Sequence, residues 1–104
     1  MKVLNQSRNF TSFQCDKSRA FYIDFGHKNI KFSFCQLLAF RQQVLKIDLE
    51  SHFNGKNKHG MELLMLCNRE HVLIFNTLEC VALIELIQGS FAMLELNSML
   101  AASV

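Results

Sequence analysis

The sequence contains no proline, few charged residues and no closely spaced pair of cysteines. Charged residues make up 19% of its 104 residues, whereas apolar residues make up 50%. This composition excludes a disordered tail, a proline-rich linker and a collagen-like repeat, which are defined by high charge, proline or a glycine period. A chain of this length has room for one hydrophobic core. We therefore expect residues 1–104 to form a single folded domain.

Two further absences concern the cellular location. The four cysteines, Cys15, Cys35, Cys67 and Cys80, form no C-x-x-C pair, and the first residues lack the apolar run of a secretion signal. The most apolar stretch, Leu78–Leu96, is interrupted by glutamates and a glycine, whereas a membrane helix needs about 20 mostly apolar residues. We therefore expect a cytoplasmic protein with reduced thiols and no membrane contact.

Charge and apolar residues are distributed unevenly along the chain, although the net charge is only +2. Residues 1–60 contain ten Lys and Arg side chains against four acids, whereas residues 61–104 contain one Arg against five Glu. Apolar residues number 24 in the first 60 positions and 28 in the last 44. A small domain has little interior in which to bury such an excess. The second half is therefore expected to contact another chain.

The first clear pattern covers Ala20–Phe34. Apolar residues alternate with polar ones on both sides of Gly26-His27-Lys28-Asn29, whose Gly and Asn tolerate positive φ. The pattern predicts a β-hairpin with Tyr22, Asp24 and Lys31 on its outer face, where Asp24 would pair with Lys31. Its inner face would carry Phe21, Ile23, Phe25, Ile30, Phe32 and Phe34.

A helix is expected directly after this hairpin. Ser33 and Gln36 have the S-x-x-Q spacing of a capping box, and apolar residues then recur at helical spacing, at Leu37, Phe40, Val44 and Ile47. The segment 48–60 contains two glycines and a small basic cluster, and it is interpreted as the one long loop.

The same order then recurs about 43 residues further on. Met61–Cys67 and His71–Phe75 are predicted strands, and Asn76 with Glu79 forms a second capping box that opens a helix over Thr77–Gln88. Gly89-Ser90 is expected to break or kink this helix before a last helical segment, residues 91–100. The predicted fold class is α+β. Two ββα units form a four-stranded, mainly antiparallel sheet packed by helices, with an extra C-terminal helix.

The second predicted hairpin differs from the first in having almost no alternation. Residues 63–66 and 72–75 are uninterrupted apolar runs, which favour strands covered on both faces. One layer of helices covers only one face of a sheet. Parity leaves open whether Leu64 and Leu66, or Leu63 and Met65, point outward.

Ile23-Asp24-Phe25-Gly26, together with His71 through Leu78, resembles a small family of uncharacterised bacterial proteins of Bacteroidetes type. The resemblance covers roughly residues 13–88. It implies no established activity. Members often carry a C-x-x-C near the first strand, where this chain has Cys15 and Ser18, and this departure argues against a zinc or redox role here.

The best candidate metal ligands are Cys67 and His71, with Cys15, Cys35 or His27 from the neighbouring hairpin. A structural zinc site normally needs two short-spaced ligand pairs, and only one is present. No nucleophile–base signature occurs, and the histidines, His27, His52, His59 and His71, fall in or beside predicted turns, where surface exposure is expected. We therefore predict no catalytic residues, no cofactor and no metal site.

The leading functional hypothesis is a non-enzymatic association module that forms a homo-oligomer, most simply a homodimer, through its apolar second half. The alternative is a nucleic-acid-binding accessory protein that uses the basic first half. Its candidate contacts are Lys56-Asn57-Lys58-His59, Lys2, Arg8, Lys17, Arg19, Lys28 and Lys31, with Tyr22 as the outward ring. A ligand pocket lined by Met61, Met65, Met93 and Met99 also stays open.

Overall fold

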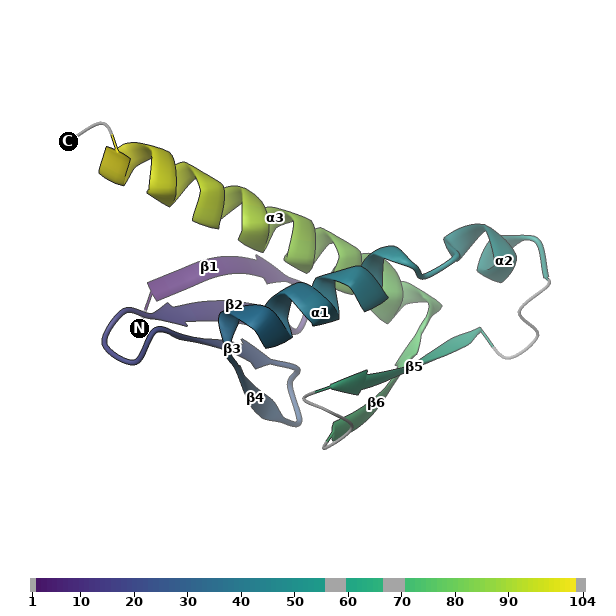
Figure 1. Ribbon diagram of the computed structural model, residues 1–104. Helices are drawn as coiled ribbons and strands as arrows, with labels where there is room; N and C mark the ends of the chain where they lie inside the picture. The colour runs from purple at the N-terminus through teal and green to yellow at the C-terminus, as the bar shows by residue number, and fades with distance from the viewer. Residues whose placement is uncertain (1, 56–59, 67–70, 103–104) are drawn as a thin grey trace.

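A computed structural model describes residues 2–55, 60–66 and 71–102, with side chains described up to residue 97 (Figure 1). Four antiparallel strands form one sheet in the order of the chain, and two more form a separate sheet. The strands are β1 (Lys2–Ser7), β2 (Phe10–Cys15), β3 (Ala20–Asp24), β4 (Asn29–Phe32), β5 (Met61–Leu66) and β6 (His71–Asn76). The helices are α1 (Phe34–Leu45), α2 (Leu49–Phe53) and α3 (Thr77–Ala102). The predicted α+β fold, with a four-stranded antiparallel sheet and a C-terminal helix, is confirmed.

The strands that form the larger sheet are not all those expected. Both predicted ββα units are present, as β3-β4-α1 and β5-β6-α3, but β1 and β2 complete the larger sheet and β5–β6 stays apart from it. The sequence analysis missed β1 and β2 because two of their buried positions are serines, Ser7 and Ser12, which hide the apolar alternation. Arg8, with φ of 53°, makes the turn between them.

The first predicted hairpin is confirmed in five of its six inward positions. Phe34 is the exception, because it begins α1 and leaves 48% of its surface exposed. Tyr22 lies opposite Lys31 on the outer face, as expected. Asp24 lies opposite Asn29 instead of Lys31, and its Oδ1 accepts a hydrogen bond from the backbone N–H of Gly26 at 2.8 Å.

Both predicted capping boxes are present. The Ser33 hydroxyl accepts from the backbone N–H of Gln36, whose side chain accepts from the N–H of Ser33. Asn76 and Glu79 make the same reciprocal pair at the start of α3, at 2.8 and 3.0 Å. These local bonds satisfy helix N–H groups that have no partner within the helix, so each strand passes directly into its helix.

Helix α3 does not break at Gly89-Ser90, which corrects the sequence-based expectation. The missing side chain of Gly89 lets Asn5 of β1 approach the helix, where its amide donates to the carbonyl oxygens of Glu85 and Leu86. The buried Ser90 hydroxyl bonds to Ser12 at 2.6 Å. These residues form a polar seam between α3 and the four-stranded sheet, and the contacts it makes offset the low helix propensity of glycine.

The hydrophobic core lies between the two long helices and the inner faces of both sheets (Figure 1). Phe32 of β4 stacks on Phe40 of α1, with ring centroids 5.4 Å apart. The ring centroid of Phe75, on β6, lies 5.9 Å from that of Phe10 and 5.8 Å from that of Phe25. Aromatic contacts of this kind join the second hairpin to the first four strands.

The segment Thr77–Asn97 of α3 has the length and mean hydropathy, 1.5, of a helix that can cross a membrane. A third of its most apolar window is buried inside the protein. Part of α3 packs on β1 and β2 through the polar seam. The expected absence of membrane contact stays a prediction.

Candidate interaction surface

The outer face of the β5–β6 hairpin exposes a group of apolar side chains. The inward side chains of the hairpin are buried, at Leu64, Leu66, Leu73 and Phe75. The outward apolar side chains are between 42% and 59% exposed, at Met61, Leu63, Met65, Val72 and Ile74. We call these five residues the hairpin face. The described part of one chain covers only the inner face of the hairpin, so the expected cover of the outer face by another chain stays a prediction.

The strand register makes the hairpin face continuous. Leu63 lies opposite Ile74, and Met65 lies opposite Val72. Directly opposed side chains in an antiparallel pair have Cβ atoms about 5 Å apart, so these four side chains touch one another across the strands. Asn76, opposite Met61, is the one polar residue among the six outward positions, and none of the six carries a charge.

The edge of the hairpin along β5 is partly closed by a side chain. Gln43 of α1 donates from Nε2 to the carbonyl oxygen of Met65 at 2.7 Å and accepts from the N–H of the same residue at 3.3 Å. The amide group thus takes the place that a peptide of a neighbouring strand would occupy. A strand of another chain that paired with β5 at Met65 would have to displace Gln43. The outer face of the hairpin is therefore more accessible than its β5 edge.

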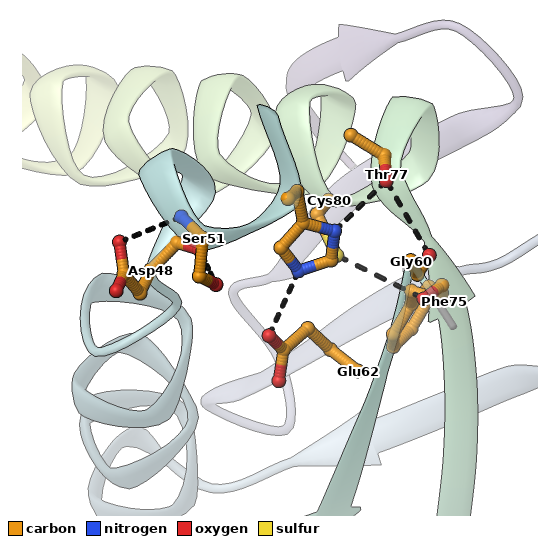
Figure 2. Close-up of polar contacts among 8 residues, drawn as sticks. Asp48, Ser51, Gly60, Glu62, Phe75, Thr77 and Cys80 are labelled. Carbon is orange, nitrogen blue, oxygen red and sulfur yellow. Dashed lines mark hydrogen bonds and ion pairs between the residues drawn. The ribbon is translucent and has the colours of Figure 1, made fainter. Parts of the chain in front are cut away.

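A part-buried polar cluster lies at the base of the hairpin (Figure 2). The His52 side chain is fully buried, so the expected surface exposure of this histidine is wrong. Its Nδ1 lies 2.8 Å from the Thr77 hydroxyl, and its Nε2 lies 2.9 Å from the Glu62 carboxylate. The Thr77 hydroxyl also donates to the carbonyl oxygen of Gly60, at 3.4 Å.

The segment expected to be a loop positions His52. Residues 48–60 contain the short helix α2, whose N-cap Asp48 accepts from the backbone N–H of Ser51 at 3.3 Å. This helix places the imidazole of His52 between Glu62 of β5 and Thr77 at the start of α3. The capping residue Asp48 was present in the sequence, but nothing in the sequence places His52 next to Glu62, ten residues further along the chain.

The hydroxyl, imidazole and carboxylate of this cluster stand in the order found in nucleophilic hydrolases. In this protein they satisfy one another, because Thr77 bonds to Gly60 as well as to His52, and the ring has no exposed surface. The arrangement ties three elements together, namely α2, β5 and α3. Its evident role is to fix the base of the hairpin.

The predicted metal candidates are not brought together in the described part of the chain. Cys67 lies outside the described residues. His71 is half-buried opposite Leu66, and its Nδ1 is buried with no hydrogen-bond partner among the described residues. His27 and Cys35 are exposed. Within residues 2–55, 60–66 and 71–97, no group of three metal-ligating side chains occurs.

The thiols of Cys15 and Cys80 have pKa values that are shifted in opposite directions. The Ser18 side chain and then its backbone N–H bond to the Cys15 thiol and lower its pKa below the usual value. Burial, reinforced by the carboxylates of Glu62 and Glu79, raises the pKa of Cys80 to about 11. Ser18 lies three residues after Cys15, at the position where a C-x-x-C pair would have its second cysteine, and it bonds to the single thiol of Cys15.

The three described methionines of the candidate ligand pocket lie on two different elements, β5 and α3. Met61 and Met65 belong to the hairpin face, Met93 is half-buried on α3, and the Met99 side chain lies outside the described residues. A groove of about 350 Å³ lies elsewhere, between α1 and α3. The guanidinium of Arg41 lies in this groove, over the Phe91 ring at 4.7 Å.

The basic candidates for nucleic-acid contact divide into three groups. Lys56–His59 lie outside the described residues. Lys2 lies on the helix side of the sheet, where its Nζ bonds to Asn97. The remaining candidates are exposed residues of the first four strands and their turns, at Arg8, Lys17, Arg19, Lys28 and Lys31.

Sequence reasoning missed Phe13 as a functional candidate. It lies directly opposite Tyr22 on the outer face of the four-stranded sheet. The sequence Phe10-Thr11-Ser12-Phe13 has no apolar alternation that would mark Phe13 as outward, and only the pairing of β2 with β3 places it beside Tyr22.

The chain was also compared with known protein families, with curated proteins and with solved structures. None of the three comparisons found a match. The resemblance to a bacterial family therefore stays a prediction, and the function has to be argued from the surfaces described above.

Proposed function

We propose that this protein is a non-enzymatic association module that forms a homodimer through the hairpin face. The observation that carries the proposal is the continuous row of five half-exposed apolar side chains on β5 and β6. An exposed apolar patch on a regular element typically marks an interaction site. In the dimer, the hairpin faces of two copies pack against each other as two sheets do, about 10 Å apart.

A second copy of the chain suits this surface better than a different partner. The hairpin face has no charge with which to select an oppositely charged partner, and apolar faces are complementary to themselves. Two copies related by a two-fold axis each cover the apolar face of the other. In such a dimer both faces of the hairpin are covered, as its uninterrupted apolar sequence favours.

The size of the interface requires a contribution from outside the hairpin face. A stable dimer buries about 800 Å² on each partner, and five half-exposed side chains supply only part of this area. Leu78, two residues beyond β6, is 60% exposed and extends the apolar surface onto the first turn of α3. We expect it to lie at the rim of the interface.

Light scattering coupled to size-exclusion chromatography at micromolar concentration tests the proposal. The unmodified protein should have about twice its chain mass of 12.0 kDa. Leu63→Lys places a charge in the middle of the hairpin face and should give a monomer with unchanged secondary structure. A 12.0 kDa mass for the unmodified protein contradicts the proposal.

Tyr22→Lys is the matched control, because it adds the same charge at an outward position of the other sheet. It should leave the dimer mass unchanged. Leu63→Lys also separates face packing from pairing along the β6 edge, since Leu63 lies on β5 and would not disturb such an edge. A Leu63→Lys protein that keeps the dimer mass would contradict face packing.

A further inference from the structure

The outer face of the four-stranded sheet carries a row of residues that crosses all four strands. Val3 lies opposite Phe13, Phe13 opposite Tyr22, and Tyr22 opposite Lys31. Phe13 and Tyr22 are on the two central strands and are half-buried, whereas Lys31 and Val3 are exposed at the two edge strands. The row therefore places two neighbouring rings between an apolar end and a cationic end.

The helices leave this face uncovered in the described part of the chain. Phe40 of α1 stacks on Phe32, and Ser90 of α3 bonds to Ser12, and both contacts are on the opposite face of the sheet. The register places Ser12 beside the buried Ile23, so α1 and α3 share that inner face (Figure 1). The rings of Phe13 and Tyr22 point away from both helices.

The charge around the two rings is predominantly positive. Residues 2–33 contain six Lys and Arg side chains and only two carboxylates, Asp16 and Asp24. Arg8, Arg19 and Lys28 are exposed in the turns that border the sheet. One oxygen of Asp24 is occupied by the N–H of Gly26. Cations thus surround the aromatic pair on the turns at both ends of the strands.

We propose that this face binds a single-stranded polynucleotide, with unpaired bases stacked on Phe13 and Tyr22 and phosphates held by Lys31 and the turn cations. Four-stranded sheets with aromatic rings on their central strands are suited to stacking unpaired bases. Stacking on aromatic rings is tolerant of base identity, because every base has a π-face. The phosphate contacts are sequence-independent.

The same charge disfavours a second copy of the chain at this surface. Two basic faces repel each other, whereas a polyanion is attracted to both the rings and the cations. A duplex also fits poorly, because its bases are stacked on one another and cannot reach the rings. RNA and DNA single strands should bind alike, since neither stacking nor phosphate contact uses the ribose 2′-hydroxyl.

Fluorescence anisotropy with labelled dodecamers of uridine and of thymidine, at low salt, tests binding. Both should bind, and a 12-base-pair duplex should bind more weakly. Phe13→Leu and Tyr22→Leu each keep an apolar side chain but remove the ring, and each should weaken binding about tenfold. Tyr22→Phe should bind as the unmodified protein does. Phe53→Ala is the matched control, because Phe53 is an exposed ring on α2, away from the sheet.

Intrinsic fluorescence gives a second reading of the same event. The chain has one tyrosine and no tryptophan, so its emission reports on Tyr22 alone. Stacked bases should quench this emission in proportion to bound dodecamer. Lys31→Ala should reduce the slope of log affinity against log salt by about 0.7, the loss of one phosphate contact.

Several results would overturn the proposal. Absence of binding to both dodecamers at low salt, equal binding of the duplex, or unchanged affinity in the two leucine variants would each do so. Binding without quenching of Tyr22 would show contact elsewhere on the basic half and would also overturn it. The proposal is independent of the dimer, since monomeric Leu63→Lys should bind the dodecamers with the same affinity per chain.

Discussion

The two sheets of this protein have the same plan but opposite surfaces. Each buries one face against helices and rings and leaves the other uncovered within the described chain. The outward positions of the four-stranded sheet include Phe13, Tyr22 and Lys31, whereas those of β5–β6 carry no charge. The difference indicates that the inward residues decide how each sheet folds, and the outward residues decide what it can bind.

The inner faces differ as well. The four-stranded sheet meets α3 through the polar seam, with Ser12 bonded to Ser90 and Asn5 bonded to helix carbonyl groups. The hairpin is held by aromatic contacts of Phe75 and by the His52 cluster (Figure 2). Directional hydrogen bonds fix the position of α3, while the hairpin packs on the core through the Phe75 ring and three buried leucines, at Leu64, Leu66 and Leu73.

The largest expected effect separates the two faces of one strand. Phe75→Ala removes a buried ring that contacts Phe10 and Phe25, and it should lower the free energy of unfolding by about 3–5 kcal/mol. Its neighbour Ile74 points outward, so Ile74→Ala should cost less than about 1 kcal/mol in the monomeric Leu63→Lys background. Urea denaturation measures both, and similar losses at the two positions would refute the assignment of faces.

The elements that the sequence predicted are those specified by neighbours along the chain. The β3–β4 hairpin and both capping boxes depend on residues a few positions apart, and they were predicted correctly. The strands β1 and β2 were missed because their inward serines have partners on α3, almost 80 residues away. A long-range contact also explains why Gly89 was taken for a helix break. A side chain at this position would overlap Asn5, which is far away in the sequence.

The candidate surfaces were predictable to different degrees. The apolar composition of the second hairpin indicated a contact surface. In an uninterrupted apolar run, however, the sequence does not show which alternate residues point outward, so only tertiary packing identifies Leu63 and Met65 as outward. Tyr22 was recognised from alternation alone. Its neighbour Phe13 was not, because the pairing of β2 with β3 is a long-range property. The burial of His52 depends on Glu62 and Thr77 and had no local signal.

The thiol beneath the hairpin should make stability depend on alkaline pH. The pKa of Cys80 is raised to about 11 in the folded protein, whereas an unfolded thiol ionises near 8.5. Between these values the folded state holds a proton that the unfolded state has released, so the free energy of unfolding falls as pH rises. The fall should reach about 3 kcal/mol at most, once the pH exceeds both pKa values.

Denaturation midpoints at pH 8 and pH 10.5 measure this effect. Cys80→Ala should remove the Cys80 part of the pH dependence while lowering stability at both values. Cys15→Ala serves as the control, because Cys15 is at the end of β2 and has a lowered pKa. An unmodified protein and a Cys80→Ala variant with the same dependence on pH would show that Cys80 is not the group responsible.

The polar seam predicts an effect of about 1 kcal/mol whose sign depends on Asn5. A methyl group at Gly89 would overlap the Asn5 amide, so Gly89→Ala should force the amide away from the carbonyl oxygens of Glu85 and Leu86. The lost bonds and the strain should exceed the gain in helix propensity and destabilise the protein by about 1 kcal/mol.

In an Asn5→Ala background the same substitution should stabilise, by up to about 1 kcal/mol, because only the propensity gain is left. Thermal or urea denaturation of the four proteins of this cycle gives the coupling directly. Additive effects would mean that Gly89 is not required by the seam. The hairpin, which meets no helix glycine, offers no equivalent pair among the described residues.

The smallest effect concerns a reaction rate and not stability. It compares the thiol of Cys15, on the four-stranded sheet, with the buried thiol of Cys80 on α3. The Ser18 side chain and backbone N–H lower the pKa of Cys15, so a larger fraction of this thiol is thiolate near pH 7, and the thiolate is the nucleophile. Alkylation by iodoacetamide followed by peptide mass spectrometry should modify Cys15 faster than the buried Cys80. Ser18→Ala should slow Cys15 severalfold at pH 7 and have little effect at pH 10, where the thiol is ionised in both proteins. An equal slowing at both pH values would mean that Ser18 acts on access to the thiol and not on its ionisation.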